Sequence, residues 1–260
     1  SADMDSDGTY LYVIPDDATK NVYRHLLSTT TGSWDTFSTT GITGDFYYSN
    51  LQADANYIYV IDSGPKVLRH TTTNTSSAWE AFPTVPTSAG QGNLANGARI
   101  SINSTDIFLL PGSDATNTFR HTLSNTSDAW VSYPAFTQIG PTYDYVGNIK
   151  ATETAIFVAD YGTCDTFLRD IADTTSAWAT STVVANLTDA TFAKDDTYVY
   201  LNSGASTPYF YRRALADTSS AWTAFTNLPF QANKYTGGTV EVGGGTIYVL
   251  GGATTNNIFT

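Results

Sequence analysis

The chain has 260 residues, of which 12 are basic and 24 acidic, so its net charge at pH 7 is −12. A negative field of this size repels phosphate backbones, which excludes nucleic acid as a partner. The hydrophobic content of 41% excludes a disordered chain, and no stretch approaches the roughly 18 apolar residues of a membrane span.

Six apolar runs rich in β-branched and aromatic residues predict β-strands. They are Thr9–Ile14, Tyr57–Ile61, Asp106–Leu110, Ala155–Ala159, Tyr198–Leu201 and Thr246–Leu250. Because these runs are almost continuously apolar, we expect both faces of each strand to be covered. A weaker strand is predicted ahead of each run, at Ala2–Asp5, Ser49–Ala53, Arg99–Ile102, Asn148–Ala151, Thr191–Lys194 and Thr239–Val242.

A third recurrent segment begins with an aromatic or leucine residue and an arginine, and it ends in a tryptophan. The tryptophans are Trp34, Trp79, Trp130, Trp178 and Trp222, separated by 45, 51, 48 and 44 residues. Self-similarity at this period is typical of propellers and solenoids. Four antiparallel strands per repeat, without any helical periodicity, indicate propeller blades.

The sequence therefore predicts an all-β, six-bladed β-propeller of four-stranded antiparallel blades that forms one domain, residues 1–260. The predicted blades are residues 1–40, 45–86, 92–137, 143–185, 187–230 and 236–260. The last range stops at the counterpart of a third strand, so the sixth blade lacks its outer strand. An open sheet edge is usually covered. We expect either that the chain is cut short there or that a protein partner adds a strand at the open edge.

Two motifs resemble the kelch family of β-propellers. Ile247-Tyr248-Val249-Leu250-Gly251-Gly252 matches the apolar strand that ends in a glycine pair, and Asn74-Thr75-Ser76-Ser77-Ala78-Trp79 matches the turn that leads to a tryptophan. The glycine pair is present in one blade, and Arg-His replaces the family's usual Tyr-Asp. The resemblance implies a propeller that serves as an interaction module, although some kelch propellers are oxidases or sugar-modifying enzymes.

The repeated tryptophans are predicted to pack between adjacent blades, because their presence in five blades favours a structural role. Arginines at one repeated position beside them are expected to stack on aromatic rings and to bond carbonyl groups. The alternative is that these arginines and tryptophans bind sugars. The pattern is then similar to that of fucose-binding propeller lectins, in which arginine, tryptophan and a carboxylate line sugar pockets between blades. Carboxylates follow the tryptophan in two blades, as Asp35 and Glu80. The arginines are Arg24, Arg69, Arg120, Arg169 and Arg212.

The three histidines, His25, His70 and His121, follow this arginine in three separate blades. Separated by whole blades, they cannot converge on a metal or form a base–nucleophile pair. Cys164 is the single cysteine, so it forms no disulfide within the chain, and a copper site like that of galactose oxidase cannot assemble. We predict no metal site, no cofactor, no catalytic residue and no enzymatic activity.

Two sets of residues are candidate binding sites. Loops on one face combine aromatic rings and carboxylates, which suit hydroxyl-rich ligands or a basic protein, although a solvated face with nothing bound is an equal alternative. This loop-face set is Tyr47, Tyr48, Asp62, Asp114, Tyr143, Tyr145, Asp160, Tyr161 and Tyr235. The first strands are expected to line a central channel, where no acid–base pair for sugar chemistry can be assigned. This channel set is Asn50, Arg99, Asn148, Lys150 and Glu241.

The function expected from these features is that of a non-catalytic propeller that acts through protein–protein contacts. Turns rich in Thr, Ser and Asn, with few lysines, indicate an extracellular location or the surface of a cell, an appendage or a virion. The alternatives are a multivalent carbohydrate-binding lectin and a sugar-active enzyme that uses the mouth of the channel. The expected partners are a protein or a glycan, without membrane insertion.

Overall fold

The computed structural model describes most of the chain and shows an all-β protein. Within the described residues there is no helix, and hence none long and apolar enough to cross a membrane. The described residues are 3–15, 20–29, 31–44, 46, 50–62, 66–86, 94, 98–112, 117–136, 148–159, 165–183, 187, 190–204, 209–216, 221–225, 239–243, 246–250 and 258–259.

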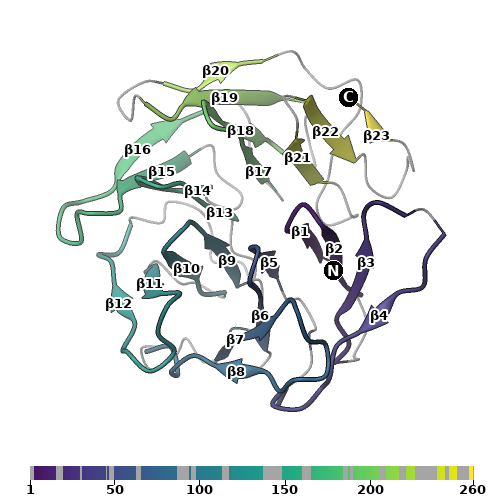
Figure 1. Cartoon of the computed structure of the whole chain (residues 1–260). Helices are drawn as coiled ribbons and strands as arrows, with labels where there is room; N and C mark the ends of the chain where they lie inside the picture. The colour runs from purple at the N-terminus through teal and green to yellow at the C-terminus, as the bar shows by residue number, and fades with distance from the viewer. Residues whose placement is uncertain are drawn as a thin grey trace. The chain divides into compact units, whose positions relative to one another are not determined.

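The first compact unit, Ser1–Tyr133 with Tyr143–Val146, contains three four-stranded antiparallel sheets (Figure 1). Blade 1 consists of β1 (Asp3–Ser6), β2 (Tyr10–Ile14), β3 (Tyr23–Leu26) and β4 (Asp35–Thr36). Blade 2 consists of β5 (Leu51–Ala53), β6 (Tyr57–Asp62), β7 (Lys66–Thr71) and β8 (Glu80–Ala81). Blade 3 consists of β9 (Arg99–Ile102), β10 (Asp106–Leu110), β11 (Phe119–Thr122) and β12 (Val131–Ser132).

The second compact unit, Pro134–Thr142 with Gly147–Thr260, contains three further sheets. Blade 4 consists of β13 (Asn148–Ala151), β14 (Ala155–Ala159), β15 (Asp165–Asp170) and β16 (Ala179–Thr182). Blade 5 consists of β17 (Thr191–Lys194), β18 (Tyr198–Asn202), β19 (Phe210–Ala214) and β20 (Thr223–Ala224). A three-stranded sheet follows, made of β21 (Thr239–Gly243), β22 (Thr246–Leu250) and β23 (Ile258–Phe259).

These sheets are the blades of a β-propeller fold, as the repeat predicts. The structure shows five four-stranded blades, not six, because the range predicted as the sixth blade forms the three-stranded sheet β21–β23. In every sheet the strands lie in chain order and pair antiparallel, which is the arrangement that successive hairpins produce.

Each blade has two different faces, because successive side chains along a strand point to opposite sides. In blade 1, Val13 on β2 lies opposite Met4 and Tyr23, whereas Tyr12 lies opposite Asp5 and Arg24. We call the face with Val13, and with its counterparts Val60 and Leu109 in blades 2 and 3, the tryptophan face, since the tryptophan packs there. The face with Tyr12, Tyr59 and Phe108 is the tyrosine face.

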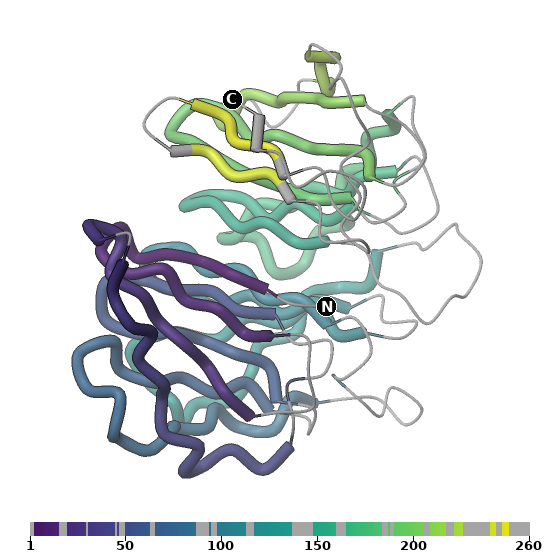
Figure 2. The backbone as a smooth tube through the Cα atoms, turned by 90° about the vertical axis from the view of Figure 1, so that its right-hand side faces the viewer, coloured from purple at the N-terminus to yellow at the C-terminus, as the bar shows by residue number. Residues whose placement is uncertain are grey.

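Neighbouring blades bury a tyrosine face against a tryptophan face. Tyr12 and Phe37 of blade 1 share a buried cluster with Val60, Leu68 and Trp79 of blade 2. The same contact recurs once more in the first unit and again in the second, where the clusters join Tyr59 with Leu109 and Trp130, and Phe157 with Leu201 and Trp222. In Figure 2 the purple strands of blade 1 lie beside the blue strands of blade 2 within the first unit. Within each unit, these interfaces therefore join the tyrosine face of one blade to the tryptophan face of the next blade.

Candidate functional site

The tryptophans form a series of hydrogen bonds from blade to blade. The indole N–H of Trp79 donates to the carbonyl of Ser38 at 2.7 Å, and that of Trp130 donates to the carbonyl of Pro83 at 2.8 Å. In the second unit, Trp178 donates to Pro134 at 2.7 Å. Each acceptor stands two residues after a short fourth strand, β4, β8 or β12. The predicted packing of tryptophans between blades is correct for Trp79 and Trp130 in the first unit.

Trp34 departs from this pattern, and the prediction that it packs between blades is wrong. Its side chain is 47% exposed, against 5% for Trp79 and 6% for Trp130. Within the described residues its indole N–H has no hydrogen-bond acceptor, and its ring contact is with His25, 5.1 Å between centroids. Among the described residues of the first unit, the tyrosine faces of blades 1 and 2 cover Trp79 and Trp130, and none covers Trp34.

The other residues of the tryptophan face are also more exposed in blade 1 than in blade 2. In blade 2 the residues equivalent to Met4, Val13 and Tyr23 are Leu51, Val60 and Leu68, all at 0% exposure. In blade 1 Met4 is 46% exposed, and Val13 and Tyr23 are half-buried. Val13, Tyr23 and Trp34 line a shallow apolar hollow of about 310 Å³. The tryptophan face of blade 1 is thus an apolar surface that in other blades forms an interface.

A buried hydrogen-bond donor holds the turn that leads to each tryptophan. His70 lies opposite Ile58, and its Nε2–H donates to the carbonyl of Ser77 at 2.9 Å. His121 donates in the same way to Asp128 at 2.7 Å. Both imidazoles pack against the tryptophan of their own blade, with ring centroids 4.9 and 5.1 Å apart. These contacts give His70 and His121 a structural role.

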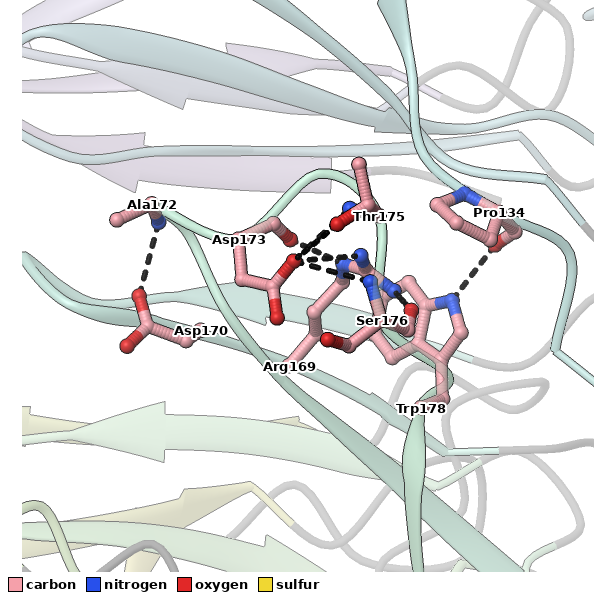
Figure 3. Close-up of polar contacts among 8 residues, drawn as sticks. All are labelled: Pro134, Arg169, Asp170, Ala172, Asp173, Thr175, Ser176 and Trp178. Carbon is pink, nitrogen blue, oxygen red and sulfur yellow. Dashed lines mark hydrogen bonds and ion pairs between the residues drawn. The ribbon is translucent and has the colours of Figure 1, made fainter.

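Arg169 occupies this histidine position and not that of the other arginines, although it stacks on an aromatic ring and bonds carbonyl groups as predicted. Arg169 lies opposite Ile156, as His70 lies opposite Ile58, and it donates to the carbonyls of Asp173, at 2.7 Å, and Ser176 (Figure 3). Ser176 is the seventh residue after Arg169, just as Ser77 is the seventh after His70. The guanidinium also lies 5.6 Å from the centre of the Trp178 ring. Its side chain is 2% exposed, so this position accommodates a buried cation.

The turn around Arg169 also fixes a carboxylate. The Asp173 side chain accepts hydrogen bonds from the backbone N–H groups of Thr175 and Ser176, both at 2.9 Å. Hydrogen bonding, first from the Ser176 side chain and then from these two N–H groups, lowers the pKa of Asp173 well below its usual range. A hollow of about 140 Å³ lies at this turn. Its polar groups are already used by the turn itself, which argues against a ligand there.

The true arginine set lies on the tyrosine face and joins blades within the first unit. Arg69 stacks 4.5 Å from the centre of the Tyr57 ring, pairs with Glu80 at 2.8 Å and donates to the carbonyl of Leu123 in blade 3 at 2.6 Å. Arg24 repeats the arrangement with Tyr10, Asp35 and the carbonyl of Thr72. The carboxylates after the tryptophan therefore neutralise these arginines. The guanidinium groups have few donors left for a sugar.

The other two arginines of the set keep the position but change partners. Arg120 forms two contacts of 2.9 Å with Asp106, whose side chain is 2% exposed, and hydrogen bonding to this carboxylate raises the pKa of Arg120. Arg212 stacks 4.7 Å from the centre of the Tyr198 ring. The predicted stacking on an aromatic ring is confirmed for Arg24, Arg69 and Arg212, as it is for Arg169.

An aspartate–tyrosine pair, not anticipated from the sequence, organises the first hairpin of three blades. Asp195 accepts from the N–H groups of Thr197 and Tyr198, at 2.7 and 2.6 Å, and from the hydroxyl of Tyr200 at 2.8 Å. Burial and then the bond to Asp195 raise the pKa of Tyr200 to about 12. Asp7 with Tyr12 and Asp54 with Tyr59 repeat the motif. The recurrent spacing Asp-x4-Tyr is the sequence signal that would have revealed it.

One member of the predicted loop-face set lies within the described residues. Asp62 at the end of β6 is fully buried and accepts two hydrogen bonds from Thr43, from its N–H at 3.0 Å and its hydroxyl at 2.9 Å. Its assignment to a ligand-binding face is wrong, because its carboxylate ties the connection between blades 1 and 2. The other members fall outside the described residues: Tyr47, Tyr48, Asp114, Tyr143, Tyr145, Asp160, Tyr161 and Tyr235.

The channel set lies on first strands as predicted, but Asn50, just before β5, is a structural residue. Asn50 is buried, donates from its amide to Asp3 at 2.5 Å and accepts from the N–H of Ile100 at 2.7 Å. It thereby links the first strands of blades 1, 2 and 3. Its assignment as a free channel residue is wrong.

The remaining channel residues are distributed over both units. Arg99 on β9 is partly buried and donates to the carbonyl of Ala98 at 2.9 Å, and Asn148 on β13 donates to the carbonyl of Ala190 at 3.2 Å. Lys150 on β13 is half-buried, and Glu241 on β21 is exposed. In the part of the chain that the structure describes, no group of three or more His, Cys, Asp or Glu side chains is placed to hold a metal ion. Cys164 lies outside that part.

Comparison with known proteins bears on the fold alone. No family model matches the chain, and no curated protein matches it. Among solved structures, the chain is similar to YjhT, with a TM-score of 0.67 and 9% sequence identity, over 99% of this chain and 92% of that one. At this identity the likeness concerns architecture and carries no activity over to this chain.

Proposed function

We propose that this propeller is a non-catalytic binding module that works through protein–protein contacts, and that the tryptophan face of blade 1 is its contact surface. The observation that carries the proposal is the exposure of Trp34 beside the apolar hollow lined with Val13 and Tyr23. Large aromatic side chains that are exposed in an apolar patch are typical of protein interaction sites.

The chemistry of this face supports a protein rather than a sugar as ligand. The hollow is lined by a valine, a tyrosine and an indole, and Met4, which pairs with Val13, is 46% exposed. Sugar sites need several polar side chains around the aromatic platform, whereas this surface offers mainly apolar area. Burial of such area is the usual driving force of association between proteins.

The remaining features of the proposal concern architecture and location. We propose that the three-stranded sheet β21–β23 counts as a sixth, incomplete blade and that the repeat is kelch-like, on the strength of the Gly251-Gly252 and Trp motifs. The acidic, Thr- and Ser-rich composition supports a place outside the cell or on a virion surface.

Site-specific photocrosslinking tests the proposal. The variant Tyr23→p-benzoylphenylalanine places a crosslinker in the hollow, and the same replacement of Val131, which is 48% exposed on β12, is the matched control. In the native host we expect position 23, and not position 131, to capture one polypeptide reproducibly. That polypeptide, once purified, should bind wild-type protein and bind Trp34→Ala more weakly in calorimetry. Saturable binding on a glycan array, without any polypeptide crosslinked at position 23, would replace the proposal with the lectin alternative.

A further inference from the structure

We infer that the tryptophan face of blade 1 binds an extended peptide segment of a partner chain that presents an aromatic side chain followed directly by a free backbone carbonyl. The inference rests on the proposed function and specifies the kind of partner. It is drawn from what covers the same face in the other blades of the first unit.

The interface occurs twice in that unit in a filled form. Trp79 is covered by the segment after β4, where Phe37 packs at 6.3 Å between ring centroids and Ser38 accepts the indole hydrogen bond. Trp130 is covered by the segment after β8, where Phe82 packs at 6.0 Å and Pro83 accepts. In both cases an aromatic residue and the next carbonyl act as a pair.

The same two segments make a second ring contact. Phe37 meets His70 edge-on at 4.9 Å, and Phe82 meets His121 edge-on at 5.0 Å. Blade 1 carries the matching receptor groups: His25 stands in the histidine position, 5.1 Å from Trp34 between ring centroids. Blade 1 therefore has all the groups that bind the covering segment in blades 2 and 3. The indole N–H of Trp34, which has no acceptor within the described residues, marks where the carbonyl of that segment would lie.

The energetics favour occupation by such a segment. An aromatic ring that enters the hollow buries apolar area on Tyr23 and Trp34, and contacts between aromatic rings stabilise the complex beyond that area. The indole hydrogen bond then fixes the direction of the backbone. Specificity comes from the spacing between the aromatic ring and the carbonyl of the bound segment. A segment that has the ring but no carbonyl at this spacing leaves the indole N–H of Trp34 without its hydrogen bond.

The chain itself supplies the probe. A synthetic peptide with the sequence of residues 77–86, which contains Phe82 and Pro83, is titrated into ¹⁵N-labelled protein, and the indole N–H signals are followed by NMR. The Trp34 signal is assigned from its loss in Trp34→Phe. We expect this signal to shift while the indole signals of Trp79 and Trp130 stay in place. A control peptide with Phe82→Ala should bind about tenfold or more weakly, the usual effect of removing an aromatic anchor.

Two protein variants complete the design. Trp34→Phe keeps the ring but removes the N–H donor and should weaken peptide binding, whereas Tyr248→Ala, which removes another exposed aromatic on β22, should leave it unchanged. Absence of any Trp34 shift at millimolar peptide would overturn the inference, as would equal binding of the Phe82→Ala peptide. A Trp34 shift that depends on protein concentration, with a doubled mass in sedimentation, would show instead that a second copy occupies the face. If position 23 captures a polypeptide but the peptide does not bind, the proposed function stands and this inference fails.

Discussion

The indole N–H of Trp79 donates to the carbonyl of Ser38, 41 residues earlier in the chain, at 2.7 Å. Ser38 in turn comes four residues after Trp34. One short segment therefore carries the tryptophan of its own blade and, four residues later, the acceptor for the tryptophan of the next blade. This double role decides which tryptophans matter for stability.

Truncation of a covered tryptophan should be far more harmful than truncation of the exposed one. Trp79→Ala removes a buried indole and its bond to Ser38, so we expect it to lower the free energy of unfolding by about 3–5 kcal/mol. Trp34→Ala, at a side chain that is 47% exposed, should cost about 1 kcal/mol or less. Urea denaturation followed by far-UV circular dichroism measures both. Equal losses would contradict the assignment of Trp34 as an uncovered position.

Two glycines with positive φ allow the cost of backbone strain to be measured apart from the cost of a steric clash. Gly41 has a φ of 96°, and a Cβ added there would lie 2.6 Å from the carbonyl oxygen of Trp79. Gly8 has a φ of 85°, but an added Cβ would meet no atom within 4 Å. Gly8→Ala should therefore cost only the left-handed conformation, about 1–2 kcal/mol, and Gly41→Ala should cost clearly more. Thermal unfolding of the two variants side by side tests this, and a larger loss for Gly8→Ala would refute it.

The register of Arg169 can be tested by replacing it with the residue that other blades use. Arg169→Met leaves the carbonyls of Asp173 and Ser176 without their buried donor, and we expect a loss of about 1–3 kcal/mol. Arg169→His should recover part of that loss, because His70 and His121 serve the equivalent turns. Denaturant unfolding is the measurement. A histidine variant no more stable than the methionine variant would speak against the shared position.

The phenol of Tyr200 should ionise only at strongly alkaline pH. Burial, with the bond to Asp195, raises its pKa from 10.0 to about 12 in the folded protein. Since the folded pKa is the higher one, the contribution of this phenol to stability is fully present below pH 10 and is lost as the pH rises towards 12. The absorbance of tyrosinate, titrated in wild type and in Tyr200→Phe, should give a difference curve centred near pH 12. A midpoint close to 10 would mean that the hydroxyl is not held by Asp195.

The strand pattern was readable from the sequence because each blade has the same local chemistry. The predicted runs Asp106–Leu110 and Ala155–Ala159 coincide with β10 and β14. Burial between two neighbours makes such strands continuously apolar, and that signal does not depend on distant parts of the chain. The total number of blades was overestimated, because the described residues of the last range form a three-stranded sheet and not a sixth blade.

Arg169 shows where pattern matching reached its limit. The tryptophan follows the arginine by ten residues in blade 1 but by nine in blade 4. In a strand a shift of one residue moves a side chain to the opposite face, so the arginine of blade 4 joined the histidines. Counting back from Trp178 instead of matching residue types would have shown the shift.

Trp34 could not be distinguished from the other tryptophans by sequence. All five tryptophans belong to similar segments. Their burial depends on whether another blade supplies an aromatic ring, as Phe37 does, and a backbone carbonyl, as Ser38 does. Asp62 and Asn50 were misread for a related reason: their polar side chains suggest solvent or ligand, while their actual partners, Thr43 and Ile100, lie in segments far along the chain.

The double role of the segments that hold Trp34, Trp79 and Trp130 also bears on how such a protein changes its length over evolutionary time. When two of these repeats are cut at the same point, the chain can gain or lose a whole repeat, and the indole at the new junction still finds the carbonyl that the upstream repeat provides. Recombination between these repeats is therefore structurally silent at the junction.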